Sequence, residues 1–220
     1  MSSGSGQKSR PYRLSKRAEQ IDDTRLRIVE ATVALHGTVG PARTTIMGIA
    51  QRAGVTRATV YRHFPDEPAL FEACSAHWFT QQVPPDPSSW TRITDPVERT
   101  RTGLTDIYRF YRAGEPMLTR IHRDKSFLPD DSRHRLNQRD DQSRDLLLAA
   151  FPPRKERHLL RAVLGHAVAF WTWRSLCIEH GLENGEAVRL MVDLVTTAAR
   201  PGLDRGHPGP DWPPADQGGP

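Results

Sequence analysis

A short run of polar and cationic side chains is the part of this sequence best suited to binding chemistry. Its members are Thr56, Arg57, Thr59, Tyr61, Arg62 and His63. Hydroxyl, guanidinium and imidazole groups donate hydrogen bonds to phosphate oxygens and to base edges, and arginine on guanine is the commonest base-specific pair. The run therefore predicts a nucleic-acid contact, with Arg57 as the base reader. Tyr61, Arg62 and His63 are placed to contact flanking phosphates.

A short helix must precede this run if its side chains are to project from the protein. Ile46, Ile49 and Ala50 have the spacing of a buried helical stripe, and Ala50 is small enough for a second helix to cross closely. Thr44 or Thr45 can cap the start of this helix, which we expect to reach about Arg52. Both threonines are also candidates for DNA contact.

A tight turn and a second helix follow directly. Gly54 stands where the turn favours a positive φ, and Thr56 can cap a helix that ends before Pro65. Val55 and Val60 are expected to pack back into the core. Two short helices with this spacing form a helix-turn-helix, in which the second helix projects toward DNA.

The rest of the chain predicts an all-α fold of about nine helices. Helical periodicity runs from Asp22 to His36 and from Asp66 to Trp78, and a Pro-rich break covers Val83–Ser89. Further helices are expected at about 95–113, 116–124, 131–151, 154–180 and 184–200. The expected organisation is a disordered basic arm (1–20), a helix-turn-helix domain (21–66), a helical ligand-binding and dimerisation domain (67–200) and a disordered Gly/Pro-rich tail (201–220).

Charge is distributed unevenly along the chain. Residues 1–65 hold 11 Lys and Arg against 4 Asp and Glu, whereas the remainder holds 20 against 22. A basic segment on a nearly neutral body indicates an anionic partner. Double-stranded DNA is the leading candidate, and an acidic membrane surface is the second.

Several other kinds of chemistry are missing from the sequence. The two cysteines, Cys74 and Cys177, lie far apart and outside any paired-cysteine motif, which favours a reducing, cytoplasmic setting without a structural metal. The sequence holds no P-loop, GxSxG or HExxH motif. His122-Arg123-Asp124 resembles a kinase catalytic loop, but Pro129 stands where asparagine is required. We expect no enzyme activity, no metal, no cofactor and no membrane span.

The segment from Thr44 to Phe64 resembles the DNA-binding region of the TetR family, and the resemblance covers about residues 22–72. The matching positions are Thr45, Ile49, Ala50, Ala53, Gly54, Val55, Thr56, Val60, Tyr61, His63, Phe64 and Leu70. The family usually has lysine at the position of Glu67, so one phosphate contact is expected to be altered here, and Pro68 lacks an N–H. Gly48, inside the first short helix, should cost about 1 kcal/mol relative to alanine.

The resemblance also implies a dimer that an unknown small-molecule effector releases from a pseudo-palindromic operator. The last two helices are expected to pair with those of a second copy through apolar stripes that include Leu176, Val188, Met191, Val192 and Val195. Residues expected to line an effector pocket are Tyr108, Tyr111, Met117, His122, Phe127, His166, Phe170 and Trp171. Each of these could instead belong to an ordinary core.

Two other functions remain open at this point. The chain could be a helical enzyme with a vestigial helix-turn-helix, if distant residues converge in space. It could also be a small-molecule-binding or protein-binding module that has lost DNA binding, which Glu67 and Pro68 make conceivable.

Overall fold

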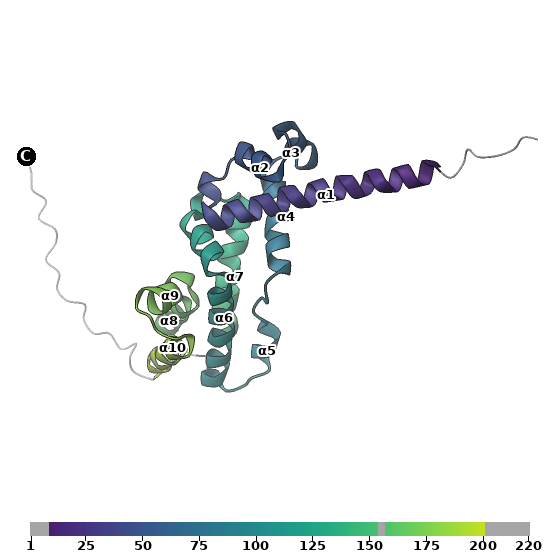
Figure 1. Cartoon of the computed structure of the whole chain (residues 1–220). Helices are drawn as coiled ribbons and strands as arrows, with labels where there is room; N and C mark the ends of the chain where they lie inside the picture. The colour runs from purple at the N-terminus through teal and green to yellow at the C-terminus, as the bar shows by residue number, and fades with distance from the viewer. Residues whose placement is uncertain (1–8, 154–156, 201–220) are drawn as a thin grey trace, which may run out of the picture. The chain divides into compact units, whose positions relative to one another are not determined.

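The computed structural model describes residues 9–153 and 157–200, and in this part of the chain every regular element is helical (Figure 1). The ten α-helices are α1 (Ser9–Thr38), α2 (Ile46–Ala53), α3 (Arg57–His63), α4 (Glu67–Thr80), α5 (Pro87–Thr91), α6 (Pro96–Arg123), α7 (Asp130–Leu148), α8 (His158–Val168), α9 (Phe170–Arg174) and α10 (Asn184–Ala198). Short 3₁₀ turns cover Pro41–Arg43 and Lys125–Phe127, and a π-helical turn covers Ser175–Glu179. The all-α class is confirmed. No helix among the described residues has both the length and the hydropathy to cross a bilayer.

The chain divides into two units that each have their own core. The described residues of the first unit are 9–85 and 109–139, and those of the second are 86–108, 140–153 and 157–200. Helices α6 and α7 contribute residues to both units. This division differs from the expected boundary at residue 66, because α4 belongs to the same unit as α1 to α3.

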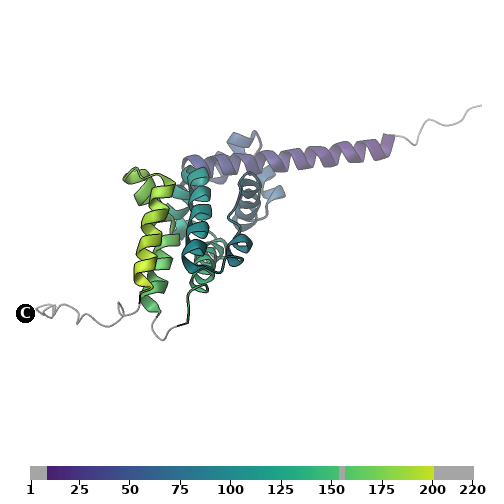
Figure 2. The same cartoon turned by 90° about the horizontal axis from the view of Figure 1, so that it is seen from below.

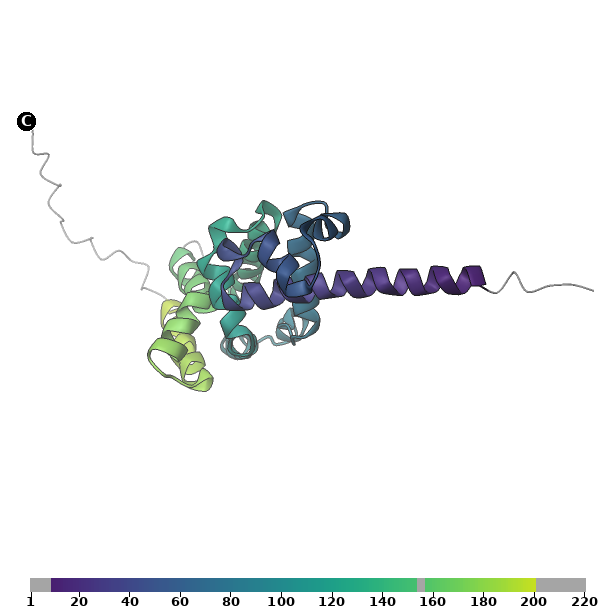
Figure 3. The ribbon, with the colours of Figure 1, turned by 45° about the horizontal axis from the view of Figure 1, so that its top comes forward.

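The first unit holds the helix-turn-helix. Its core joins side chains of α1, α2, α3 and α4, namely Ile28, Val29, Ala31, Ile49, Ala50, Ala53, Val60, Phe64, Leu70 and Cys74. The predicted stripe of α2 is part of this core, and Ile46 and Val55 pack against it. Figure 3 shows α2 and α3, the two short blue helices, beside the purple α1.

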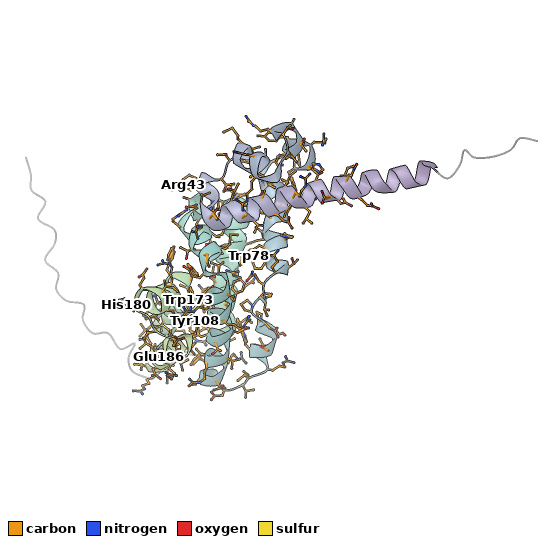
Figure 4. All side chains as sticks on the ribbon, viewed as in Figure 1. Arg43, Trp78, Tyr108, Trp173, His180 and Glu186 are labelled. Carbon is orange, nitrogen blue, oxygen red and sulfur yellow. The ribbon has the colours of Figure 1, made fainter. Side chains whose placement is uncertain are left out.

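The second unit is organised around α8, α9 and α10, and α10 packs along α8 (Figure 2). Hydrogen bonds tie these helices to Tyr108, near the middle of α6. The Tyr108 hydroxyl donates to the Ala167 carbonyl (2.8 Å), and Asn184 Nδ2 donates to the Tyr108 carbonyl (3.1 Å). Trp173 Nε1 in turn donates to Asn184 Oδ1 (3.1 Å), and Figure 4 labels Tyr108 and Trp173.

Three helix boundaries differ from the prediction. Helix α1 begins at Ser9, so residues 9–20 of the arm expected to be disordered are helical, in keeping with its Arg, Lys, Glu and Gln residues, which are good helix formers. Helix α6 runs through Pro116, where we expected a break. The segment expected at 154–180 is interrupted at Ala169, whose ψ of 135° is extended. Residues 1–8 and the predicted tail at 201–220 lie outside the described part.

Candidate nucleic-acid interface and neighbouring cavity

Side-chain caps fix the two helices of the helix-turn-helix. The Thr45 hydroxyl accepts a hydrogen bond from the Gly48 N–H (3.1 Å), and the Thr56 hydroxyl accepts one from the Thr59 N–H (3.2 Å). Gly54 has φ 66° and ψ 39°, the left-handed conformation that glycine adopts most easily. The caps and the turn predicted from the sequence are therefore confirmed, and Thr45 rather than Thr44 is the cap of α2.

Two arginines of α1 hold the other ends of these helices. Arg27 Nη1 donates to the Ala53 carbonyl at the end of α2 (3.0 Å), and Arg25 Nη1 donates to the His63 carbonyl at the end of α3 (3.1 Å). The Arg25 guanidinium also lies over the Phe64 ring, 4.2 Å from its centroid. Cations suit these positions because the C-terminal carbonyls of a helix carry partial negative charge. The prediction did not include this role, although both arginines stand on the expected first helix.

The side chains predicted to contact DNA lie mostly on the outside of α3. Arg57, Tyr61 and Arg62 are exposed, and the Tyr61 side chain retains 46% of its accessible surface. The hydroxyls of Thr56 and Thr59 hydrogen-bond to each other (3.0 Å) at the start of the helix. Arg57 and Tyr61 are one turn apart, so they share a face that is free to enter a groove.

The remaining predicted contacts have more local partners. The Thr44 hydroxyl donates to the Gly40 carbonyl (2.8 Å), which orders the turn before α2. His63 is partly buried, and desolvation, followed by the charges of Arg62 and Arg25, lowers its pKa. A neutral His63 can donate one hydrogen bond to a phosphate but adds no cationic charge at neutral pH.

The start of α4 carries two acids, and one of them, Glu67, stands where lysine was expected from the resemblance. Asp66 caps the helix by accepting a hydrogen bond from the Ala69 N–H (2.8 Å), and Glu67 is exposed in the first turn. Acids stabilise a helix N-terminus but repel a phosphate at the same place. Two acids at this N-terminus agree with the prediction that a phosphate contact is altered here, which stays a prediction.

The end of α6 is bound to the turn that precedes α2, and we call this set of contacts the α6 clamp. Asp124, which is buried, accepts hydrogen bonds from the Ala42 N–H (3.1 Å) and from Arg123 Nε (2.7 Å). Arg123 Nη2 also donates to the Val39 carbonyl (2.9 Å), and Arg120 Nε donates to the Thr38 carbonyl (2.7 Å). The hydrogen bonds from Arg123 are the largest cause that lowers the pKa of Asp124, so its carboxylate is ionised near neutral pH.

A cavity of about 230 Å³ lies within the first unit, between α1, α4, α6 and α7. Its lining residues are Val33, His36, Phe71, Cys74, Ser75, Trp78, Phe79, Met117, Leu118, Ile121, Leu128, Ser132, Arg135, Leu136 and Arg139. Trp78, labelled in Figure 4, lies in the wall that α4 provides. Burial lowers the pKa of His36 to about 4 and raises that of the Cys74 thiol to about 12, so both side chains are neutral at pH 7.

Residues 28–74, which include the whole helix-turn-helix, match the bacterial regulatory proteins of the TetR family. Residues 28–74 therefore carry a DNA-binding region of the TetR family. This assignment agrees with the capped helices, the Gly54 turn and the exposed face of α3.

The HTH-type transcriptional regulator TtgR of Pseudomonas putida is 42% identical over 55 residues, which are 25% of this chain and 26% of that protein. The match thus spans about a quarter of this relative.

Solved structures share the fold over a longer stretch of this chain. NalD, the secondary repressor of the MexAB-OprM multidrug efflux pump in Pseudomonas aeruginosa, has a TM-score of 0.53 and 16% identity over 82% of this chain and 97% of its own. A TetR transcription regulator from Haloarcula marismortui ATCC 43049 has a TM-score of 0.52 and 19% identity over 81% and 97%. At these identities the likeness shows the fold alone.

Of the residues predicted to line an effector pocket, only Met117 lines this cavity. Tyr108, Tyr111 and Phe170 are core residues with at most 3% of their surface exposed. Phe127 is 70% exposed and borders a second, more polar cavity of about 240 Å³. His122 is partly buried beside Arg139. The Nδ1 atom of His166 hydrogen-bonds the Thr172 hydroxyl. Trp171 is exposed.

The residues predicted for the dimer interface are also placed differently. Val188, Met191, Val192 and Val195 of α10 are buried within the chain, where α10 packs on α8, and Leu176 is partly buried. The apolar spacing identified the buried face of α10 but gave no sign that the chain itself covers it. The large apolar side chains that stay exposed in the second unit are Trp171, Ile178, Leu190 and Leu194.

Proposed function

We propose that this protein is a cytoplasmic, sequence-specific DNA-binding transcriptional regulator, a repressor that a small-molecule effector releases from its operator. The observation that carries the proposal is the exposed face of α3, with Arg57 and Tyr61 one turn apart on a helix capped at both ends. The match of residues 28–74 to the TetR family supports it, as do the roles of TtgR as a transcriptional regulator and of NalD as a repressor.

The cavity between α1, α4, α6 and α7 supports the effector step. Helix α4 begins shortly after the core residue Phe64, and Phe71 and Trp78 of the same helix line the cavity. Helix α6 contributes Met117 to the cavity, and Asp124 at its end belongs to the α6 clamp. A ligand that favours a different placement of α4 or α6 would therefore shift α3 and weaken DNA binding by its differential affinity for the two forms.

Two copies of the chain are needed to read a pseudo-palindromic operator. Leu190 and Leu194 support a homodimer through α10, because they are one turn apart and keep 47% and 42% of their surface exposed. This face replaces the buried residues predicted earlier. A two-fold dimer would set the two α3 helices about 34–36 Å apart, one turn of DNA.

A gel shift with the DNA that flanks the protein's own gene, at fixed salt, tests this function. The wild type should bind one fragment in preference to scrambled DNA of equal length. Arg57→Ala should lower that preference by about 1–3 kcal/mol, whereas Tyr61→Phe should weaken binding to both DNAs alike. Arg101→Ala, a change of an arginine paired with Glu98 in the second unit, is the matched control and should leave binding unchanged.

Failure of the wild type to bind any flanking fragment above scrambled DNA would refute the proposed function. It would favour the second candidate, a small-molecule-binding module without DNA binding. The observation that favours this candidate is the pair Asp66 and Glu67, which neutralises the start of α4.

A further inference from the structure

The cavity of the first unit has apolar walls and one cationic side. Val33, Phe71, Trp78 and Met117 are typical of its lining, while Arg135 and Arg139 of α7 supply the charge. Its volume of about 230 Å³ is just below the range of about 300–1,000 Å³ found for drug-sized ligands. The cavity therefore suits a small molecule with an apolar body.

Arg139 lines this cavity with a hydrogen-bond donor that has no acceptor among the described residues. Its Nη2 is buried and has no hydrogen-bond partner among the described residues. The guanidinium lies 5.4 Å from the centroid of the Phe110 ring, which stabilises a cation but accepts no strong hydrogen bond. A buried guanidinium N–H without an acceptor is costly, so an acceptor supplied by a ligand would stabilise the site.

The surroundings of Arg139 favour an anionic ligand over a neutral one. Arg135 lies one turn earlier on α7, and two like charges at this spacing repel each other. The described residues that line the cavity include no Asp or Glu. His36 and the Cys74 thiol are neutral at pH 7, so they add no negative charge.

We propose that the cavity binds a small amphipathic carboxylic acid, with its carboxylate on Arg139 and Arg135 and its apolar body against Phe71, Trp78 and Met117. The inference rests on the proposed function only in that this acid would be the effector. A guanidinium suits the role because it stays charged and presents parallel N–H groups to the two oxygens of a carboxylate.

Calorimetric titration of the DNA-free protein at pH 7.4 tests the inference with octanoate and 1-octanol, which have the same chain length, and with 1-naphthoate as a flat, aromatic acid. The wild type should bind at least one of the two acids, and that acid about 10-fold or more tightly than octanol. Arg139→Met should weaken binding of the acid about 10- to 100-fold, the effect of one charge-assisted hydrogen bond. Octanol binding should be unchanged in this variant, which also shows that the cavity still forms.

Arg133→Met is the matched control, because Arg133 is on the same helix, pairs with Asp130 and does not line the cavity. Equal affinity for acid and alcohol, no binding of either acid, or equal effects of the two methionine variants would overturn the inference. These outcomes are separate from the gel shift, which uses no ligand. Operator binding without acid binding would refute the inference alone, and the reverse result would refute the proposed function alone.

Discussion

Replacing Asp124 with alanine tests the α6 clamp, the set of contacts that joins the cavity helix α6 to the turn before α2. The change removes a charge-assisted hydrogen bond to the Ala42 N–H, which should cost about 1.5–3 kcal/mol. It also removes the pair with Arg123, whose side chain is 49% exposed, so that this part adds only about 0–1 kcal/mol. The expected loss in the free energy of unfolding is therefore about 1.5–4 kcal/mol.

Urea unfolding of wild type and variant at pH 7 measures this loss. Asp141→Ala is the control, because Asp141 also pairs with an arginine, Arg144, but is 59% exposed and should lose less than about 1 kcal/mol. The pKa of Asp124 is lowered in the folded state, so its stabilisation is present above the ordinary carboxyl pKa of about 4 and disappears as the pH falls through the lower, folded value. The stabilities of wild type and Asp124→Ala should thus converge at low pH. Equal losses for the two alanine variants would refute the reasoning.

Two further predictions concern the oligomer and the buried histidine. Light scattering should show that Leu190→Arg converts the dimer to a monomer. The control Val83→Arg, at a 70% exposed position outside α10, should leave the dimer intact. A monomeric wild type would exclude the α10 interface. His36, with a folded pKa of about 4 against about 6.5 when unfolded, favours unfolding as the pH falls across that window, by up to about 3 kcal/mol. His36→Phe should flatten the dependence of unfolding on pH between 4 and 6.5, and an unchanged slope would show that another group titrates.

The helix-turn-helix was predictable because its signals are local. Thr45, Gly54 and Thr56 act within four residues of where they stand, through caps and a single backbone conformation, and the apolar spacing of α2 and α3 needs only the helical period. Val60 was expected to pack into the core and is buried.

The cavity was not predictable in the same way because its walls come from four helices far apart in the sequence. Aromatic residues such as Tyr108 and Phe170 are as suitable for a core as for a pocket, and the structure places both in the core. Helix α6 continues through Pro116, although proline removes a helical hydrogen bond, because Tyr111 and Leu118 are buried on either side. Glycine is required at position 114 because Trp78 packs so closely that a Cβ there would lie 2.9 Å from the indole.

One consequence of helix α4 concerns how the protein would respond in the presence of its own operator. The same 14-residue helix starts next to α3 and ends in the cavity wall. DNA binding and effector binding would therefore both depend on the position of this helix. Linkage between two sites is reciprocal, so an effector that weakens DNA binding by a given factor is itself bound more weakly, by that factor, when DNA is present. The effector concentration at which the protein leaves the DNA would then be set by the operator as well as by the cavity. A tighter operator would make the same chain a less sensitive detector.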